Sequence, residues 1–354
     1  MILNIIINMR ENQVYRLSSG GVALNPYQVQ NAQNKQIMKK AREMGIECEP
    51  LIPGCEDFLE LSYRGKTIVI NKTRSHKMPL MAGLLAKNKD ASNLLLRRRG
   101  LPVPDYIVVS QAGEEAVRFL NTHRMVIVKP LDTSRSVGVT LRIDREDDLE
   151  NAVKTARLHS EQVMIQQYVE GTDFRVLVIG GKAIGALEYK PAFIEGDGRS
   201  TIEQLIRKLN EDQLRRNSVG DAGSFQPVDV ESKSLLMHLQ ELGKSLQAVL
   251  EQGERVELFS GGNILADGIS EIVLDRSEDI SAVNANIAVE AAKALQVDVA
   301  GIDIRCRDIR LPLNDENGGI LEVNALPDMI DPSLFFQGAS TDVFQSYLQY
   351  LFEE

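Results

Sequence analysis

The sequence predicts an α+β protein of two or three subdomains, and three observations support this fold class. The chain has 354 residues, which is more than a single simple core usually supports. From Val126 onward, short apolar segments typical of strands alternate with segments of helical periodicity. A hairpin interrupts this alternation, because Gly180-Gly181 fits a tight reversal between segments 175–179 and 183–189. Hairpins mixed with helices favour α+β subdomains over one parallel sheet.

The individual elements follow from hydrophobic periodicity and from the residues that end helices. Residues 30–47 carry apolar side chains at helical spacing, and residues 87–99 form a helix that Gly100 and Pro102 stop. Residues 211–231 are polar with scattered glycines, which is typical of a mobile loop. The other expected elements are strands at 57–63, 66–71, 126–129, 138–143 and 163–168, and helices at 146–158, 200–209 and 282–296.

Composition and charge exclude several classes of protein. The chain has 50 acidic and 40 basic residues, and the resulting charge of −10 argues against a nucleic-acid-binding surface. Its three cysteines are too few and too irregularly spaced for a disulfide framework or a zinc site, so a reducing cytoplasm is expected. No apolar run approaches the ~18–20 residues that a membrane helix requires. The apolar segment 1–10 indicates a first strand rather than a signal peptide.

Two strand-like segments near the C-terminus form a candidate metal site. The first contains Asp303, and in the second Glu322 and Asn324 point to one face because side chains alternate along a strand. If the two strands run side by side, three oxygen ligands converge, and such a set suits a hard cation such as Mg²⁺. Taken alone, the same residues are also explained by two ordinary edge strands with solvated acids.

A hydroxyl-rich loop follows a buried strand that ends in Lys129. The loop contains Ser134 and Ser136 and is followed by Gly138, so its backbone N–H groups can fold over phosphate oxygens. Lys129 would add a positive charge beside them. A surface β-turn is the alternative interpretation, and the sequence has no GxxxxGK[ST] motif.

A third candidate segment runs from Gln166 to Asp173, where a strand passes into a turn. The free backbone groups at a strand end can pair with the edge of an adenine. An acid a few residues further on, here Asp173, can hold the ribose hydroxyls. A strand followed by a polar turn explains the same residues equally well.

Taken together, these segments resemble the ATP-grasp superfamily, and within it the ligase domain shared by cyanophycin synthetase and bifunctional glutathione synthetase. The motifs occur in family order and span about residues 86 to 330. The matching stretches are Val128–Pro130, Ser134–Val139, Gly171–Val178, Lys190–Ala192, Gly196–Ile202, Gly301–Asp303 and Glu322–Ala325. No single motif is specific, but the ordered set is hard to reach by chance.

The resemblance implies an ATP-grasp fold, in which two α+β subdomains grip ATP, preceded by a small pre-grasp α/β domain. The expected boundaries are 1–85 for the pre-grasp-like domain, 86–170 for the small subdomain and 171–354 for the large subdomain with the metal site. The implied cofactors are ATP and two Mg²⁺ ions, with Mn²⁺ as a possible substitute. Relatives are commonly dimers or tetramers, so a homo-oligomer is expected.

The resemblance also implies a role for each site residue. The catalytic residues would be Arg175 and Lys190, near the γ-phosphate and the acyl group. The nucleotide would be bound by Lys89, Lys129, Ser134, Ser136, Gly138, Gln166, Val169 and Asp173. The substrate would meet Asn263, and the metal ligands would be Asp303, Glu322 and Asn324.

Some positions depart from the family pattern. Ser134 and Ser136 stand where relatives often have glycine, which would stiffen the loop. Asp328 follows Pro327 at a place where many relatives have glycine. We hypothesise that Asp328 recognises an ammonium group or another donor on the substrate. The alternative is that Asp328 is the N-cap of a helix over 329–336.

The implied activity is ATP- and Mg²⁺-dependent ligation of a carboxylate to an amine. The products would be an amide, ADP and phosphate, formed through an acyl phosphate, and the substrates would be amino acids or amino-acid-like small molecules. A free-standing cytoplasmic ligase that binds neither nucleic acid nor membrane is expected. The alternatives are an ATP-grasp ligase that modifies a ribosomal peptide or protein, and a non-catalytic ATP-binding scaffold.

Overall fold

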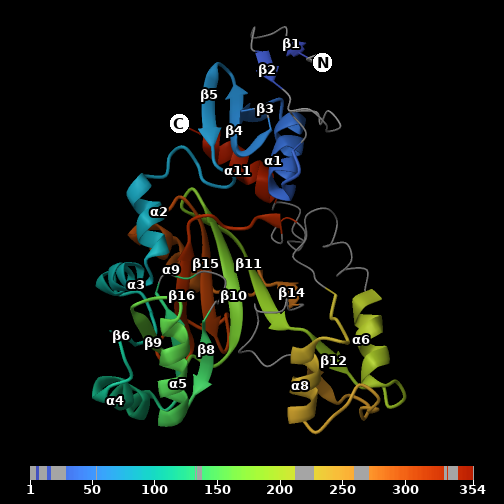
Figure 1. Ribbon diagram of the computed structural model, residues 1–354. Coiled ribbons are helices and arrows are strands. Elements are labelled where there is room, and N and C mark those ends of the chain that lie inside the picture. Colours follow the sequence, from blue (N-terminus) through green and yellow to red (C-terminus); the bar gives the residue numbers. More distant parts are fainter. Residues whose placement is uncertain are drawn as a thin grey trace.

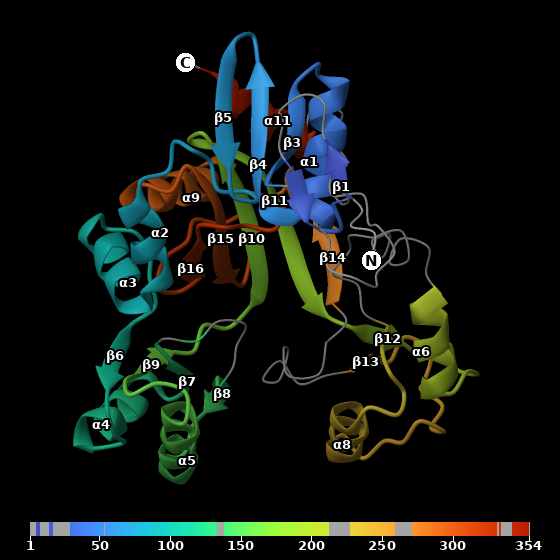
Figure 2. The ribbon, with the colours of Figure 1, turned by 45° about the horizontal axis from the view of Figure 1, so that its top comes forward.

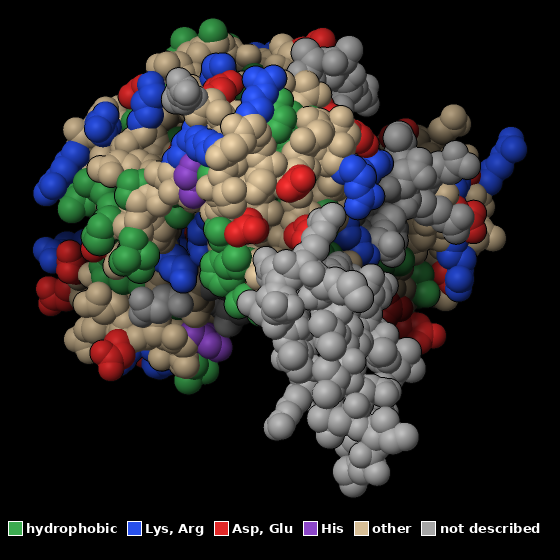
Figure 3. All heavy atoms as spheres, turned by 90° about the horizontal axis from the view of Figure 1, so that it is seen from above, with side chains coloured by type: hydrophobic (Ala, Val, Ile, Leu, Met, Phe, Trp, Pro, Cys, Tyr) green, Lys and Arg blue, Asp and Glu red, His purple; other side chains and the backbone are tan. Residues whose placement is uncertain are grey.

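The computed structural model describes most of the chain as several α/β units arranged around one central sheet (Figure 1). The described residues are 5–7, 14–16, 29–52, 54–131, 133, 138–211, 227–258, 271–330, 333 and 342–353. None of the helices in these ranges combines the length and the apolar character that a membrane span requires. On the face seen from above in Figure 3, acidic and basic side chains are interspersed rather than gathered in one basic patch.

The central sheet has five antiparallel strands in the order β14-β11-β10-β15-β16. Their bounds are β10 Thr172–Ile179, β11 Lys182–Pro191, β14 Glu271–Asp275, β15 Val299–Cys306 and β16 Gly318–Asn324. One face packs against α9 (Ala282–Ala294), and its apolar side chains include Val176 and Ile302. Because side chains alternate along each strand, Arg175 and Asp303 point to the other face.

A four-stranded sheet in the order β6-β9-β7-β8 forms the second unit. Its elements are β6 Tyr106–Val109, α4 Glu114–His123, β7 Val126–Pro130, β8 Thr140–Ile143, α5 Glu146–Arg157 and β9 Val163–Gln167. The preceding helix, α3 Lys89–Arg98, packs against β16 and α9 of the central unit. Val128 and Ile165 point to the core formed with α4 and α5. The next residue along each strand, Lys129 and Gln166, therefore lies on the opposite face.

Helices from both ends of the chain cover a third, three-stranded sheet. Its elements are α1 Ala32–Glu43, β3 Glu47–Ile52, β4 Cys55–Tyr63, β5 Lys66–Ile70 and the C-terminal helix α11 Val343–Phe352. The fully buried Tyr347 of α11 joins Leu59, Leu61 and Ile37 in one core. The C-terminus thereby lies beside the β3–β5 sheet (Figure 1). A separate short pair of strands, β1 Ile5–Ile7 and β2 Val14–Arg16, precedes this unit.

Residues between β11 and β14 build a further unit with its own apolar core. Its elements are β12 Phe193–Glu195, α6 Ile202–Glu211, α8 Lys233–Glu241 and β13 Arg255–Glu257. Ile202, Leu235 and Leu250 are completely or almost completely buried in this core. In Figures 1 and 2 this unit stands across from the β6–β9 unit, on the far side of the sheet edge formed by β11 and β14.

Two expected helices differ from the structure. The helix expected over 30–47 ends at Glu43, because Gly45 adopts a left-handed conformation (φ 71°) and the chain then enters β3. The helix expected over 87–99 is preceded by a separate helix, α2 Leu80–Lys87, and the two are divided at Asn88. The Asn88 side chain accepts a hydrogen bond from the Ala91 backbone N–H, so it caps α3 rather than continuing α2. Most of the expected loop 211–231 lies outside the described residues.

Candidate active site

Two acidic side chains meet on the open face of the central sheet. Asp303 on β15 is paired directly with Glu322 on β16, so the two segments run side by side as the expected metal site requires. The Nδ2 of Asn324 donates a hydrogen bond to the Asp303 Oδ2 at 2.8 Å. From the other side, Arg175 on β10 donates from Nε to Oδ1 at 2.7 Å and from Nη2 to Oδ2 at 3.0 Å. The three expected metal ligands and one expected catalytic residue therefore lie together.

Positive charge surrounds this acidic pair. Burial raises the pKa of Glu322, and the neighbouring Asp303 raises it further, whereas Lys89, Lys129 and Arg175 oppose the shift. The charge of Asp303 raises the pKa of Arg175, so this guanidinium stays protonated. Three cations therefore lie close to this carboxylate pair in an acidic protein. Cations that can hold phosphate oxygens, beside carboxylates that can hold a metal ion, suit a polyphosphate and its Mg²⁺.

The two lysines reach the site from different elements, β7 and α3. Lys129 lies at the end of β7, and burial lowers the pKa of its ammonium to about 8. Its Nζ donates to the Gln166 Oε1 on β9 at 2.9 Å. Lys89, the first residue of α3, donates from Nζ to the Thr133 carbonyl at 2.5 Å and so contacts the loop after β7.

Asp173 and Arg305 form a second ion pair two residues further along the same two strands. The Arg305 Nε donates to Asp173 Oδ1 at 2.7 Å, and its Nη2 donates to Oδ2 at 2.5 Å. Both residues line a cavity of about 500 Å³ together with Tyr168 and Tyr189. Arg255 of the β12–β13 unit lines the same cavity, so three units of the fold contribute to its wall.

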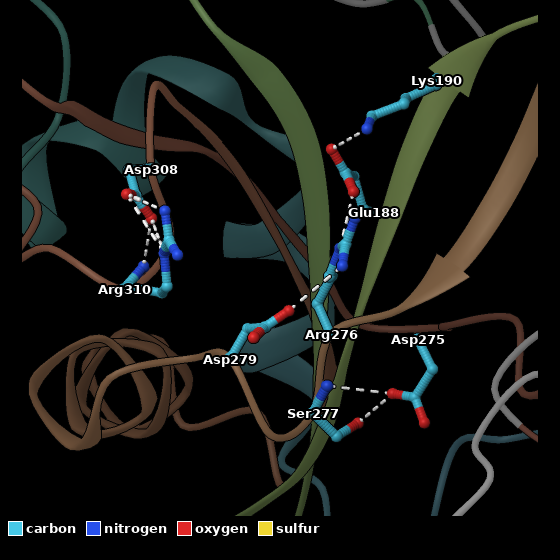
Figure 4. A network of polar contacts seen from close by, with 8 residues as sticks. All are labelled: Glu188, Lys190, Asp275, Arg276, Ser277, Asp279, Asp308 and Arg310. Carbon is cyan, nitrogen blue, oxygen red and sulfur yellow. Dashed lines mark hydrogen bonds and ion pairs between the residues drawn. The ribbon is translucent and has the colours of Figure 1, made fainter.

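Lys190 lines the same cavity as Asp173 and Arg305, and its ammonium is paired with Glu188. It follows Tyr189 on β11, and the alternation of the strand turns it to the face of Glu188. Its Nζ lies 2.9 Å from the buried Glu188 Oε1, whose other oxygen accepts from Arg276 Nε at 2.7 Å (Figure 4). This pairing neutralises a buried carboxylate at the place where β11 leaves the central sheet.

Tyr189 is a site residue that sequence reasoning missed. It is paired in register with Asp173, and the Arg175 guanidinium carbon lies 5.9 Å from the centre of its ring. The family resemblance points to Lys190, whereas the alternation of β11 puts its neighbour Tyr189 on the same face as Asp303. The period of the strand was the signal that could have identified Tyr189.

The other residues expected at the site lie in several parts of the fold, and three of them lie outside the described residues. Val169 lies in the segment between β9 and β10, and Gly138 precedes β8 with φ 74°, where an added Cβ would lie 2.7 Å from the His159 ring. Asp328 is exposed, its Oδ1 accepts from the Ile330 N–H at 3.3 Å, and its charge contributes to the raised pKa of Arg175. Both interpretations of Asp328 therefore stay open. Ser134, Ser136 and Asn263 lie outside the described residues.

The donor groups present fit a magnesium nucleotide. The carboxylates of Asp303 and Glu322 and the amide oxygen of Asn324 are the hard oxygen ligands that Mg²⁺ prefers, and phosphates would complete its coordination. The Gln166 Nε2 is buried and has no hydrogen-bond partner, which leaves a donor for a ligand. No cluster of three or more His, Cys, Asp or Glu side chains suited to a metal occurs within the described ranges.

Comparisons with known proteins agree with this geometry. Residues 102–273 match the family described as "Prokaryotic glutathione synthetase, ATP-grasp domain". The chain is 32% identical to the cyanophycin synthetase of Geminocystis herdmanii over 302 residues, which are 84% of this chain and 34% of that protein. It is 26% identical to the glutathione biosynthesis bifunctional protein of Clostridium perfringens over 325 residues, 89% of this chain and 40% of that protein.

A solved structure has the same fold. The crystal structure of a bifunctional glutathione synthetase from Pasteurella multocida superposes with a TM-score of 0.69 at 22% identity, over 90% of this chain and 44% of that one. In each of these comparisons the chain spans less than half the length of the relative that it matches.

Proposed function

Because this chain contains an ATP-grasp domain, we propose that it is an ATP- and Mg²⁺-dependent carboxylate–amine ligase. It would join amino acids or amino-acid-like small molecules by an amide bond and release ADP and phosphate. The observation that carries this proposal is the Asp303–Glu322 pair, which faces Lys89, Lys129 and Arg175. A site with this balance of charge suits phosphoryl transfer, which depends on alignment and on neutralised charge rather than on a protein nucleophile.

Different residues of the site would serve different parts of the reaction. Lys89 and Lys129 would hold phosphate oxygens, and Arg175 would lie beside the transferred phosphoryl group. Bound Mg²⁺ would supply charge neutralisation between the phosphates, held by Asp303, Glu322 and Asn324. The substrate carboxylate would take the γ-phosphoryl group and release ADP.

The second step would form the amide. The amine nitrogen would attack the acyl carbon, the bond to the phosphate oxygen would break, and the amine would lose a proton. A site that excludes water would protect the acyl phosphate from hydrolysis. The cavity lined by Tyr168, Asp173 and Tyr189 is bounded by three units of the fold, so it is suited to being closed around substrates.

The finer details of the ligands are also proposals. We propose two Mg²⁺ ions, with Mn²⁺ as a substitute, and a homo-oligomer of two or four chains. A cytoplasmic location is supported by the three cysteines, all of which are free thiols. For the acceptor, the exposed Asp328 near Arg175 supports recognition of an ammonium group. If Asp328→Gly leaves the acceptor preference unchanged, Asp328 serves only as a helix cap.

The test is phosphate release across all pairs of amino acids with Mg²⁺ and ATP, with products identified by mass spectrometry. The proposal expects at least one pair to give equal amounts of ADP and an amide product. Modification of a supplied peptide instead would favour a peptide-modifying ligase. If ATP binds but no substrate stimulates ADP release, the chain is a scaffold and the proposal fails.

A further inference from the structure

A cavity outside the proposed active site lies between the β3–β5 sheet and α2. Its volume is about 390 Å³, and its walls come from β4, β5, the segment 71–78 and α2. None of the residues that line it belongs to the proposed nucleotide, metal or substrate site. Small-molecule sites in proteins have volumes of roughly 300–1,000 Å³, so this cavity has room for a small molecule but not for a folded partner.

The walls of this cavity carry large apolar side chains that are unusually exposed. Leu80 and Leu84 on α2 are 80% and 51% exposed, and Phe58 on β4 is 42% exposed. Val69 and Met78 extend the same surface between the helix and the sheet. A single exposed leucine is ordinary, but several large apolar side chains around one cavity are typical of a binding surface.

Two cations line the same cavity, and no acid does. Arg74 and Lys87 are both part of its wall, whereas the wall contains no Asp or Glu. Within the described part of the chain, neither side chain forms an ion pair or a side-chain hydrogen bond. The Arg74 Nε is in addition buried without a partner. Because polar groups of this kind are nearly always paired when they are buried, the charge of the wall favours an anionic ligand.

Lys87 alone has a simpler explanation. It lies in the last turn of α2, where a lysine complements the helix dipole. Arg74 lies instead in the turn that joins β5 to α2, so the dipole does not account for it. The unpaired guanidinium of Arg74 is therefore the observation that points to a ligand.

We propose that this cavity binds a small carboxylic acid with an apolar tail. The tail would lie against Leu80, Leu84 and Phe58, and the carboxylate would accept hydrogen bonds from the terminal nitrogens of Arg74. A guanidinium can hold both oxygens of a carboxylate at once. A free amino acid suits the cavity less, because its ammonium group would lie beside two cations and no acid. This second site does not depend on the proposed ligase activity.

Three small molecules separate the contributions of charge and tail. 4-Methylpentanoate has a carboxylate and a branched tail, 4-methylpentanamide has the same shape without the charge, and acetate has the charge without the tail. Their binding to the full chain is measured by NMR titration in the absence of nucleotide. 4-Methylpentanoate should bind with a Kd of about 1 mM or below, and the other two at least about tenfold more weakly.

Two variants assign the head and the tail to the wall of the cavity. Arg74→Met should weaken the binding of 4-methylpentanoate about tenfold and remove its preference over the amide. Leu84→Ser should weaken the acid and the amide by the same factor and leave the preference unchanged. Neither residue belongs to a buried core, so both variants should fold. Arg98→Met is the matched control, because it removes an exposed guanidinium of α3 that does not line the cavity.

Equal affinity of the native protein for the acid and the amide would overturn the proposal, and so would an Arg74→Met variant that keeps the preference. Absence of binding at about ten times the expected Kd would also overturn it. Binding of the peptide Gly-Gly-Leu without binding of the free acid would assign the cavity to a peptide C-terminus instead. If a variant does not fold, the three molecules decide the matter in the native protein.

Discussion

Arg175 on β10 holds both carboxylate oxygens of Asp303 on β15, at 2.7 and 3.0 Å. The two residues are paired across adjacent antiparallel strands, so the backbone register itself brings the guanidinium to the acid. The same acid accepts from Asn324 and lies opposite Glu322. The Asp303 carboxylate is therefore both a proposed metal ligand and the partner of Arg175, whose positive charge is expected beside the transferred phosphoryl group.

The Arg175–Asp303 pair should contribute a measurable coupling energy to folding. Arg175→Met should lower the free energy of unfolding by about 2–3 kcal/mol, because Asp303 then loses its main partner in a partly buried position. The loss stays below that of a fully buried pair because 29% of the Arg175 side chain and 24% of the Asp303 side chain are exposed. Urea unfolding of Arg175→Met, Asp303→Asn and the double variant measures the coupling, which should be about 1–3 kcal/mol. Simple additivity of the two single changes would contradict this expectation.

Glu322→Gln should remove turnover without harming the fold. Loss of one metal-binding carboxylate removes several kcal/mol of transition-state stabilisation, so phosphate release should fall by about 10³-fold. The variant should be at least as stable as the native protein, because the pKa of Glu322 is raised by burial and by Asp303. Phosphate release and thermal unfolding are measured in parallel. The control Glu316→Gln changes an exposed acid before β16 and should keep full activity; an active Glu322→Gln enzyme would refute the metal assignment.

Lys129 should make ATP binding depend on pH. Its pKa is lowered from 10.5 to about 8 by burial, so its ammonium charge is present below about pH 8 and is lost above it. The affinity for ATP should therefore weaken between pH 7 and pH 9, and Lys129→Met should bind at least about tenfold more weakly at pH 7. Calorimetry over this range measures both effects. The dependence should disappear in Lys129→Met and persist in Lys154→Met, which changes an exposed residue of α5.

The lowered pKa of Lys129 should also make the stability of the fold depend on pH. Between about pH 8 and 10.5 the unfolded chain binds more protons at Lys129 than the folded chain does, so this residue makes stability rise with pH in that window. Below about pH 8 it contributes no slope. Comparing the pH dependence of unfolding in the native protein and in Lys129→Met isolates the contribution, and identical slopes would contradict the lowered pKa.

Asn284 should be important for stability rather than for chemistry. This fully buried side chain on α9 donates to the carbonyls of Ile309 and Leu311 and accepts from the Leu313 N–H, at 2.7, 2.8 and 2.9 Å. Asn284→Ala leaves these groups unpaired and should lower the free energy of unfolding by about 2–4 kcal/mol. Urea unfolding measures the change. Asn151→Ala, at an exposed position of α5, should stay within about 0.5 kcal/mol of the native protein, and a similarly small change at Asn284 would contradict the expectation.

Short-range features were predictable from the sequence. The β10–β11 hairpin forms where Gly180-Gly181 was expected to turn, and both glycines adopt positive φ angles of 56° and 75° that favour glycine. The predicted alternation holds for Glu322, Val323 and Asn324, whereas a register shift in the β15–β16 pairing leaves Leu321 half-buried and puts Ile320 in the core with Val323. The α+β class and the resemblance to ATP-grasp ligases, drawn from the order of several weak motifs, are confirmed by the fold and by the relatives. The boundaries expected after residues 85 and 170 stay predictions.

The local elements and most of the charged groups at the site can therefore be deduced from the amino-acid sequence, because periodicity and turn chemistry act over a few residues. Which of those groups meet depends on strand register and on how the sheets pack. Asp303 pairs with Glu322 through strand register, and Lys129 faces them from another sheet. The family resemblance implies a role for Lys190, and the pleat of β11 pairs this residue with Glu188 and turns its neighbour Tyr189 to the face of Asp303. Contacts between distant segments depend on packing and register, which no short stretch of sequence specifies.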